Sequence, residues 1–229
     1  MEKSRVIKFA AILLAAVLAH GLAAVVAYAE DVHPITHRRI AHVMSADGAD
    51  WLVRPEREGE EHPDQALDAI GIERGSVVGD VGAGVGYMTW RMAERVGPSG
   101  VVYAEDIQPE MLEKLKSNMR ERHIANVREV LGAIDDPKLP PNTLDLVLLV
   151  DVYHEFSEPE KMLDHIREAL KPGGRLVLLE YRAEDPKVPI RPEHKMTVEQ
   201  VRAEAQPEGY HFVRAIETLP EQHIIVFRK

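Results

Sequence analysis

Apolar runs of strand length alternate with amphipathic, helix-like stretches along most of the chain. The first run, Ser76 to Val81, is rich in β-branched residues, and further runs lie within 144–156 and 170–181. The segment 157–170 between these two places apolar residues at helical spacing, and the Pro-Gly pair that follows is typical of a helix end. Strands that alternate with helices predict an α/β fold with a doubly wound sheet and a ligand at the carboxyl ends of its strands.

The N-terminus has a pattern of its own. Three basic residues precede an apolar stretch from Phe9 to Tyr28, and Ala27 to Ala29 forms a small-x-small cleavage site. This order predicts a secretory signal peptide over residues 1–29, although about 20 apolar residues also suffice for an uncleaved membrane anchor. Either alternative predicts export, and the second adds association with a membrane.

Residues 30–66 are expected to form an N-terminal extension or lid, and residues 67–229 the main domain. The extension has a helical pattern around Arg38 to Met44. Its lid candidates are Trp51, Arg54, Glu56 and Arg57. The alternative is that this charged run is a solvated turn.

Composition narrows the classes of partner. The chain of 229 residues is 45% hydrophobic, which suits one globular domain with a sizeable core. Its net charge of −10 disfavours nucleic acid, because phosphate binding depends on lysine and arginine. The absence of cysteine excludes disulfides and thiolate metal sites. A small organic substrate is the better prediction.

A glycine-rich loop, Gly79 to Tyr87, follows the first predicted strand. Glycines at 82, 84 and 86 permit a tight turn and a ligand close to the backbone, and Asp106, at the end of the next strand, can bind ribose hydroxyls. The dinucleotide fingerprint needs a further glycine where Tyr87 stands. The spacing G-x-G-x-G after Asp80 instead suits a ligand with an ammonium and a carboxylate, so a nicotinamide oxidoreductase is the weaker alternative.

The motifs DVGAGVGY and AEDIQPEML together resemble those of the class I S-adenosylmethionine (SAM) dependent methyltransferases, in the branch that acts on quinones and small metabolites. The resemblance covers roughly residues 63–229 and implies a mostly parallel seven-stranded sheet. It also implies that 210–228 forms the closing antiparallel hairpin, that an N-terminal helical extension precedes the sheet, and that SAM is the cofactor. The cofactor-binding residues that it implies are Asp80, Gly82, Gly84, Gly86, Tyr87, Asp106, Ile107 and Asp135.

In that set, the glycines would hold the methionine moiety, with Asp80 supporting the loop or reaching the ammonium through water. Asp106 would bind the ribose, and Ile107 would pack on the adenine. Family members usually have an acid beside the adenine amino group, where this chain has Ala133. Asp135 is the substitute that we expect, with Asp136 or a backbone contact as alternatives.

Catalytic candidates follow the fourth predicted strand. His154 stands where that strand ends beside the transferable methyl, and a histidine there can act as a general base or anchor the acceptor. It could equally cap the following helix. Glu155 is expected either to orient His154 or to lie on the surface, and Tyr153 either to line the pocket or to pack in the core.

The long loop 180–196 is a candidate cap over the substrate, with Tyr181, Arg182 and His194 as lining residues. Three histidines at 33, 37 and 42 have no carboxylate among them at ligand spacing, so we predict no metal site.

The sequence therefore predicts a SAM-dependent methyltransferase with a small organic acceptor. Because SAM is made in the cytosol, the export signal favours an alternative of another class, an exported SAM-fold protein that binds or scaffolds without catalysis. The acceptor atom and the oligomeric state cannot be predicted from the sequence.

Overall fold

The computed structural model describes residues 32–229, which form one compact unit. The predicted signal peptide or anchor, residues 1–29, lies outside the described residues. Within 32–229, the helices are all too short or too polar to cross a membrane.

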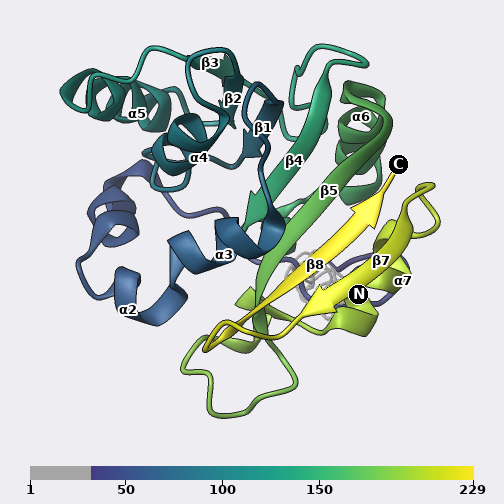
Figure 1. The fold of residues 1–229 in the computed structure, drawn as a ribbon. Helices are drawn as coiled ribbons and strands as arrows, with labels where there is room; N and C mark the ends of the chain where they lie inside the picture. Colours follow the sequence, from purple (N-terminus) through teal and green to yellow (C-terminus); the bar gives the residue numbers. More distant parts are fainter. Residues whose placement is uncertain (1–31) are drawn as a thin grey trace, which may run out of the picture. The chain divides into compact units, whose positions relative to one another are not determined.

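A single mixed sheet organises the described part of the chain (Figure 1). Its strands run in the order β3-β2-β1-β4-β5-β8-β7, and a short eighth strand, β6, pairs with β5. The strands are β1 (Val77–Val81), β2 (Val101–Asp106), β3 (Val127–Leu131), β4 (Leu144–Val150), β5 (Leu170–Arg182), β6 (Lys195–Met196), β7 (His211–Ile216) and β8 (Gln222–Arg228).

The strand directions confirm the predicted fold class. Strands β1 to β5 pair in parallel, whereas β8 runs antiparallel to both β5 and β7. The order reverses between β1 and β4, and the carboxyl ends beside this switch point are where doubly wound sheets bind ligands. The closing β7–β8 hairpin is also present as predicted.

Helices cover both faces of the sheet. They are α2 (Arg57–Glu61), α3 (Pro63–Ile70), α4 (Thr89–Val96), α5 (Pro109–Glu121), α6 (Pro159–Ala169) and α7 (Val198–Ala205), with 3-10 helices η1 (Ala46–Val53), η2 (Tyr153–Glu155) and η3 (Pro192–His194).

The central strand β4 explains the two layers. Leu146 and Leu148 belong to the core cluster that includes α3 and α4, whereas Val147 and Leu149 belong to the cluster that includes α6 and α7. Because side chains alternate along a strand, the continuous apolar run from Leu146 to Val150 must be covered on both faces. The continuous apolar run that predicted a buried strand is therefore explained.

The helix expected around Arg38 to Met44 is not present, and that prediction was wrong. The segment is irregular: Val32 and Arg39 form an antiparallel bridge, and the Ala41 N–H donates to the His154 carbonyl. Helical structure begins only at η1, where the Ser45 side chain accepts from the Asp47 N–H. Backbone contacts with the main domain therefore override the local periodicity.

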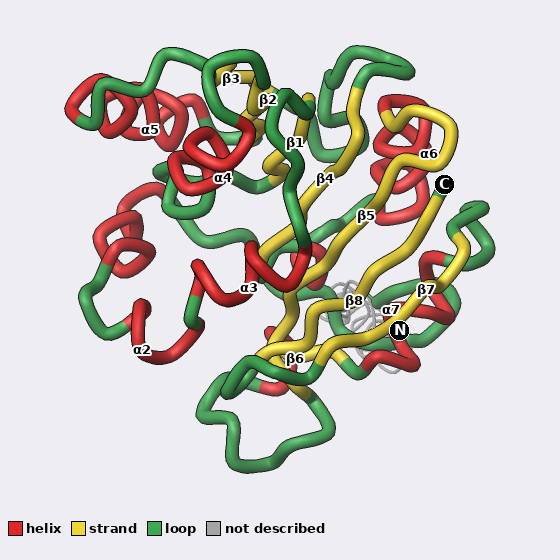
Figure 2. Tube along the Cα trace, viewed as in Figure 1, coloured by secondary structure: helices red, strands yellow, loops and turns green. Residues whose placement is uncertain are grey.

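The loop after β5 carries the chain back over the sheet edge. In Figure 2 it is the long stretch of loop that lies beside β6. Pairing of β6 with the end of β5 returns the chain to the sheet, with Tyr181 opposite Lys195 and Arg182 opposite Met196. This places η3, which immediately precedes β6, beside η2 at the end of β4.

Candidate active site

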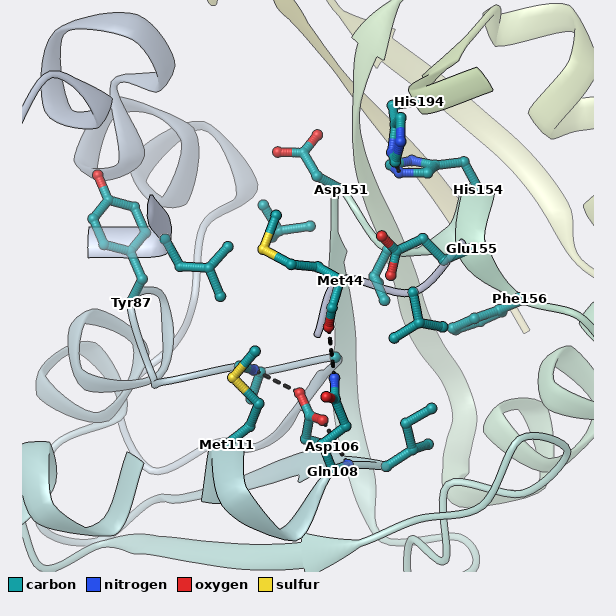
Figure 3. Close-up of a pocket in the computed structure, with 18 of the residues that line it drawn as sticks. Met44, Tyr87, Asp106, Gln108, Met111, Asp151, His154, Glu155, Phe156 and His194 are labelled. Carbon is teal, nitrogen blue, oxygen red and sulfur yellow. Dashed lines mark hydrogen bonds between the residues drawn. The ribbon is translucent and has the colours of Figure 1, made fainter. Parts of the chain in front are cut away.

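A cavity of about 570 Å³ lies at the carboxyl ends of β1, β2 and β4. The N-terminal extension contributes Met44, Trp51 and Arg57 to its wall, and the loop after β5 contributes Ile190 and His194. Figure 3 shows Asp106 at the lower edge, His154, Glu155 and His194 together on the right, and Asp151 and Tyr87 at separate places on the upper wall. The cavity is thus large enough for a cofactor and a small second molecule.

The glycine loop brings backbone, not side chains, to one wall. Gly82 and Gly84 line the cavity and have φ angles of +71° and +54°, in the left-handed region that glycine tolerates. A Cβ on Gly82 would stand 2.4 Å from Val152 Cγ2. Gly86 does not line the cavity; its missing Cβ leaves room for Leu115 and Met119 of α5.

Asp106 is fixed by backbone donors. Its Oδ2 accepts from the Gly84 N–H at 2.9 Å, and its Oδ1 accepts from the Gln108 N–H at 2.9 Å. Burial raises the pKa of Asp106 above its ordinary value, and these hydrogen bonds oppose the rise. A carboxylate has about four acceptor positions, so two remain for a ligand. Ile107 lines the cavity beside it.

Two further acids lie behind the loop. Asp80 accepts a 2.6 Å hydrogen bond from the Thr89 hydroxyl, and burial raises its pKa to about 6. Glu105 accepts from the Gly82 N–H at 3.3 Å, and burial raises its pKa to about 8. Both line the cavity, which therefore gathers carboxyl groups around the glycine loop.

Tyr87 lies between two guanidinium groups. The guanidinium carbons (Cζ) of Arg57 and Arg91 lie 4.0 and 4.5 Å from the centre of the Tyr87 ring, within the range of cation–π contacts. Arg57 is itself held by Glu61 at 2.7 Å. Tyr87 and Arg57 line the cavity, as the predictions for the loop and the lid require.

His154 is held from both sides. Its Nδ1 lies 2.6 Å from Oε2 of Glu180, at the end of β5, and its Nε2 lies 3.1 Å from Nδ1 of His194. Burial opposes the charged imidazolium, but the carboxylates of Glu180, Glu155 and Asp151 together outweigh it and raise the pKa of His154. The pKa of His194 is lowered, by burial and by the neighbouring His154.

The neighbours of His154 differ in their placement. Glu155 lines the cavity, and burial raises its pKa to about 7. Tyr153 is fully buried, packs edge-on against Phe156 and does not line the cavity. Of the alternatives left open for Tyr153, the core position is the one observed.

Comparison with known proteins identifies the family. Residues 72–220 match the family described as a methyltransferase domain, which is more than half of the chain. This chain belongs to that methyltransferase family. The resemblance read from the motifs is thereby confirmed for family and fold.

Individual relatives agree with this methyltransferase assignment. Over 116 residues the chain is 33% identical to a ubiquinone/menaquinone biosynthesis C-methyltransferase from Idiomarina loihiensis, a match that covers 50% of this chain and 46% of the relative. This chain thus spans about half the length of the curated relatives that it matches.

Solved structures extend the comparison. A SAM-dependent methyltransferase from Aquifex aeolicus is 25% identical, with a TM-score of 0.77 over 81% of this chain and 99% of that one. A [4+2]-cyclase shares the fold alone, at 16% identity and a TM-score of 0.63 over 73% of this chain and 79% of the cyclase. The fold therefore does not by itself specify the reaction.

Several predicted residues of the methyltransferase lie away from the cavity wall. Asp135 is not among its lining residues, because a bridge between Ala133 and Asp136 closes a turn that presents Ile134 instead. Arg54 stacks on Trp51 and pairs with Glu60. Two further candidates, Glu56 of the lid and Arg182 of the loop after β5, also do not line the cavity. Arg182 instead donates to the Glu217 carboxylate and to the carbonyls of Leu219 and Pro220.

The structure also adds residues that sequence reasoning missed. Asp151 lines the cavity at a φ of +50° and accepts from the Gln222 amide at 2.7 Å, and burial and the nearby Glu61 raise its pKa well above its ordinary value. Glu180 is the partner of His154. The sequence did carry a signal for both residues, because each is an acid near the carboxyl end of a central strand, and the carboxyl ends of parallel strands meet at one edge of the sheet.

Proposed function

We propose that this protein transfers the methyl group of SAM to a small organic acceptor bound in the same cavity. The observation that carries the proposal is Asp106, whose carboxylate is fixed by two backbone donors and keeps acceptor positions open beside the glycine loop. This is the arrangement that ribose hydroxyls require. The family and its SAM-dependent structural relative support the same cofactor.

The charge of the cavity complements the cofactor. Its lining includes the carboxyl groups of Asp80, Glu105, Asp106, Asp151 and Glu155. Among the lining residues of 32–229, the arginine cations are those of Arg57 and Arg191. Burial raises the pKa values of these carboxyl groups, and a sulfonium or an ammonium would stabilise their ionised forms, whereas the pyrophosphate of a nicotinamide cofactor would not.

The acceptor site that we propose is the half of the cavity lined by His154, Glu155 and His194. Methyl transfer breaks the sulfur–methyl bond, joins the methyl to the acceptor and leaves S-adenosylhomocysteine. An acceptor that carries a proton must also lose it, and the imidazole pair lies where that proton can be taken up. Glu180 positions His154 for this role through the 2.6 Å contact at Nδ1.

Much of the cavity wall is apolar. Met44, Phe156, Met162, Pro189 and Ile190 are among the residues that line the cavity. Such a wall suits an aromatic or otherwise lipophilic acceptor. The curated relative named for ubiquinone and menaquinone biosynthesis supports a quinone-like molecule as the first acceptor to test.

Calorimetric titration of the full chain with SAM, S-adenosylhomocysteine and NADH tests the cofactor half of the proposal. We expect binding of the first two and none of NADH. Transfer of labelled methyl from SAM to a panel of phenols, hydroquinones and naphthols then tests catalysis. Binding of SAM with no transfer to any acceptor would favour the non-catalytic alternative, and absence of SAM binding would contradict both.

We also propose that the domain acts outside the cytosol. The support is the basic, apolar and small-residue order of residues 1–29. A reporter phosphatase that becomes active only after export, fused to the C-terminus of the chain, tests this proposal. The control is the same fusion without residues 1–29. Equal reporter activity in the two fusions would contradict export.

A further inference from the structure

Three ligand-type side chains meet on one wall of the cavity. They are His154 from η2, Glu155 beside it, and His194 from η3, which the chain brings back from 40 positions away. One nitrogen of each histidine and one carboxylate oxygen lie within 4.8 Å of one another. Figure 3 shows the two imidazoles edge to face, with the carboxylate of Glu155 turned toward the same space.

The spacing of these atoms fits a single ion. His154 Nε2 and His194 Nδ1 are 3.1 Å apart. Two nitrogens bound to one tetrahedral zinc ion, each at about 2.0–2.1 Å, lie about 3.3 Å from each other. One Glu155 carboxylate oxygen lies within 4.8 Å of both nitrogens, so a small side-chain adjustment would bring it to an ion held between them. Two histidines and one carboxylate leave a fourth position open, as in catalytic zinc sites.

A buried carboxylate already fixes one of the ligands. Glu180 is fully buried, and its Oε2 contacts His154 Nδ1 at 2.6 Å while its Oε1 accepts from the Tyr153 N–H at 3.1 Å. The proton of His154 is thereby held on Nδ1, and the lone pair of Nε2 faces His194 and the cavity. A carboxylate that orients a histidine in this way is the usual partner of a metal-binding imidazole.

Local charge also favours a cation. Glu155 and Asp151 line the cavity near His154, and Glu180 lies directly behind it. Arg57 and Arg38 pair with Glu61 and Glu204, while Arg191 lines the cavity beside His194. Burial raises the pKa values of Asp151 and Glu155 towards their neutral forms, and a divalent ion at the imidazole pair would stabilise the ionised carboxylates.

We propose that His154, Glu155 and His194 bind a divalent transition-metal ion, Zn²⁺ by the chemistry of its ligands, whose open position faces the acceptor. The inference rests on the proposed function, because the open coordination position of the ion is the place where the proposed acceptor would bind. The ion would lower the pKa of an acceptor hydroxyl, so that its proton would pass to water, its oxygen would take the methyl from the sulfur, and S-adenosylhomocysteine would leave. With the ion bound, His154 and His194 would serve as its ligands, and the proton uptake proposed above for the imidazole pair would pass to solvent.

Titration of the tag-free, chelator-treated full chain with Co²⁺ tests the site without any need for turnover. We expect one ion per chain and the visible ligand-field absorption of tetrahedral cobalt, which an equivalent of Zn²⁺ removes. His194→Ala and Glu155→Gln should weaken binding by about 10-fold or more. The matched control is His165→Ala. His165 is an exposed histidine on α6 that contacts Glu168, and its variant should bind cobalt like the native chain.

Glu180→Gln tests the positioning role separately. Loss of the partner of a metal-binding histidine typically weakens metal affinity by about 10- to 100-fold. We expect such a loss while the thermal unfolding midpoint and SAM affinity remain near native. Equal cobalt affinity in the native chain and in Glu180→Gln, with the fold retained, would contradict the orientation argument and count against the site.

Titration of SAM on the same samples separates this inference from the proposed function. If SAM binds but cobalt gives no ligand-field band, the metal site is overturned, and the 3.1 Å contact is a shared proton between two histidines. If cobalt binds at the three ligands but SAM does not bind, the site stands and the proposed function fails. A native band that persists unchanged in His194→Ala would also overturn the site.

Discussion

Replacement of Asp106 by alanine gives the sharpest test of the cofactor half of the cavity. The carboxylate uses two of its acceptor positions on the Gly84 and Gln108 N–H groups, which leaves two for the ribose hydroxyls. A hydrogen bond to a charged group contributes about 1.5–3 kcal/mol. Loss of two such bonds removes at least about 3 kcal/mol of binding free energy, so we expect the Kd for SAM to rise about 100-fold or more.

The assay is calorimetric titration of SAM and of S-adenosylhomocysteine, which shares the ribose and should lose affinity by the same factor. A SAM analogue without ribose hydroxyls completes a double-mutant cycle between ligand and protein. It should bind the native chain weakly, and its affinity should fall little further in Asp106→Ala. The unfolding midpoint of the variant, measured without ligand, reports any disturbance of the glycine loop.

Asp135→Ala distinguishes the two acids that the sequence assigned to the cofactor. Because Asp135 is not among the lining residues, we expect its Kd for SAM to stay within about threefold of native. The reasoning is refuted if Asp106→Ala, correctly folded, binds SAM within about threefold of native. A large loss in Asp135→Ala would instead restore the adenine role that its sequence position suggested.

Two further predictions concern the loop. Gly82→Ala combines a φ of +71° with a Cβ 2.4 Å from Val152, so we expect it to lower the free energy of unfolding by about 2–4 kcal/mol, measured by urea denaturation. Gly71→Ala has a φ of +68° and nothing within 4 Å, and should lose clearly less; equal losses would contradict the steric argument. Burial raises the pKa of Glu105 from 4.5 to about 8, so the folded state binds more protons than the unfolded state across this interval. The free energy of unfolding of the ligand-free chain should therefore fall as pH rises from about 5 to 8, by an amount of the order of a few kcal/mol. Glu105→Gln should flatten this slope, and an unchanged slope would show that other groups cause it.

The sequence was sufficient to bring the glycine loop and Asp106 to one end of the sheet because its signals there are local. The glycine spacing and the acid at the end of β2 lie within about one strand and helix of each other, and a parallel β-α-β unit brings such ends together. The burial of β4 was also predictable, since a continuous apolar run in a parallel sheet implies cover on both faces. Asp106 and Ile107 accordingly line the cavity where the motifs placed them.

The N-terminal extension could not be predicted in the same way. The apolar spacing around Arg38 to Met44 is helical, yet Ala41 donates to the His154 carbonyl and Arg38 reaches the same carbonyl at 3.0 Å. A segment whose backbone is bonded to a distant loop takes its conformation from that loop, and periodicity carries no information about such contacts.

The two halves of the cavity therefore differ in what determines them. The half around Asp106 is built from neighbouring strand ends, whereas the half around His154 needs Glu180 from β5 and His194 from the loop beyond it. Those contacts depend on how β6 returns the loop to the sheet edge, which no local motif encodes. A change in the length or sequence of 183–194 would thus move His194 and leave Asp106 in place, since the Asp106 carboxylate is held by the Gly84 and Gln108 N–H groups and not by this loop. Acceptor choice and activation should accordingly be separable from SAM binding by substitutions in this one loop.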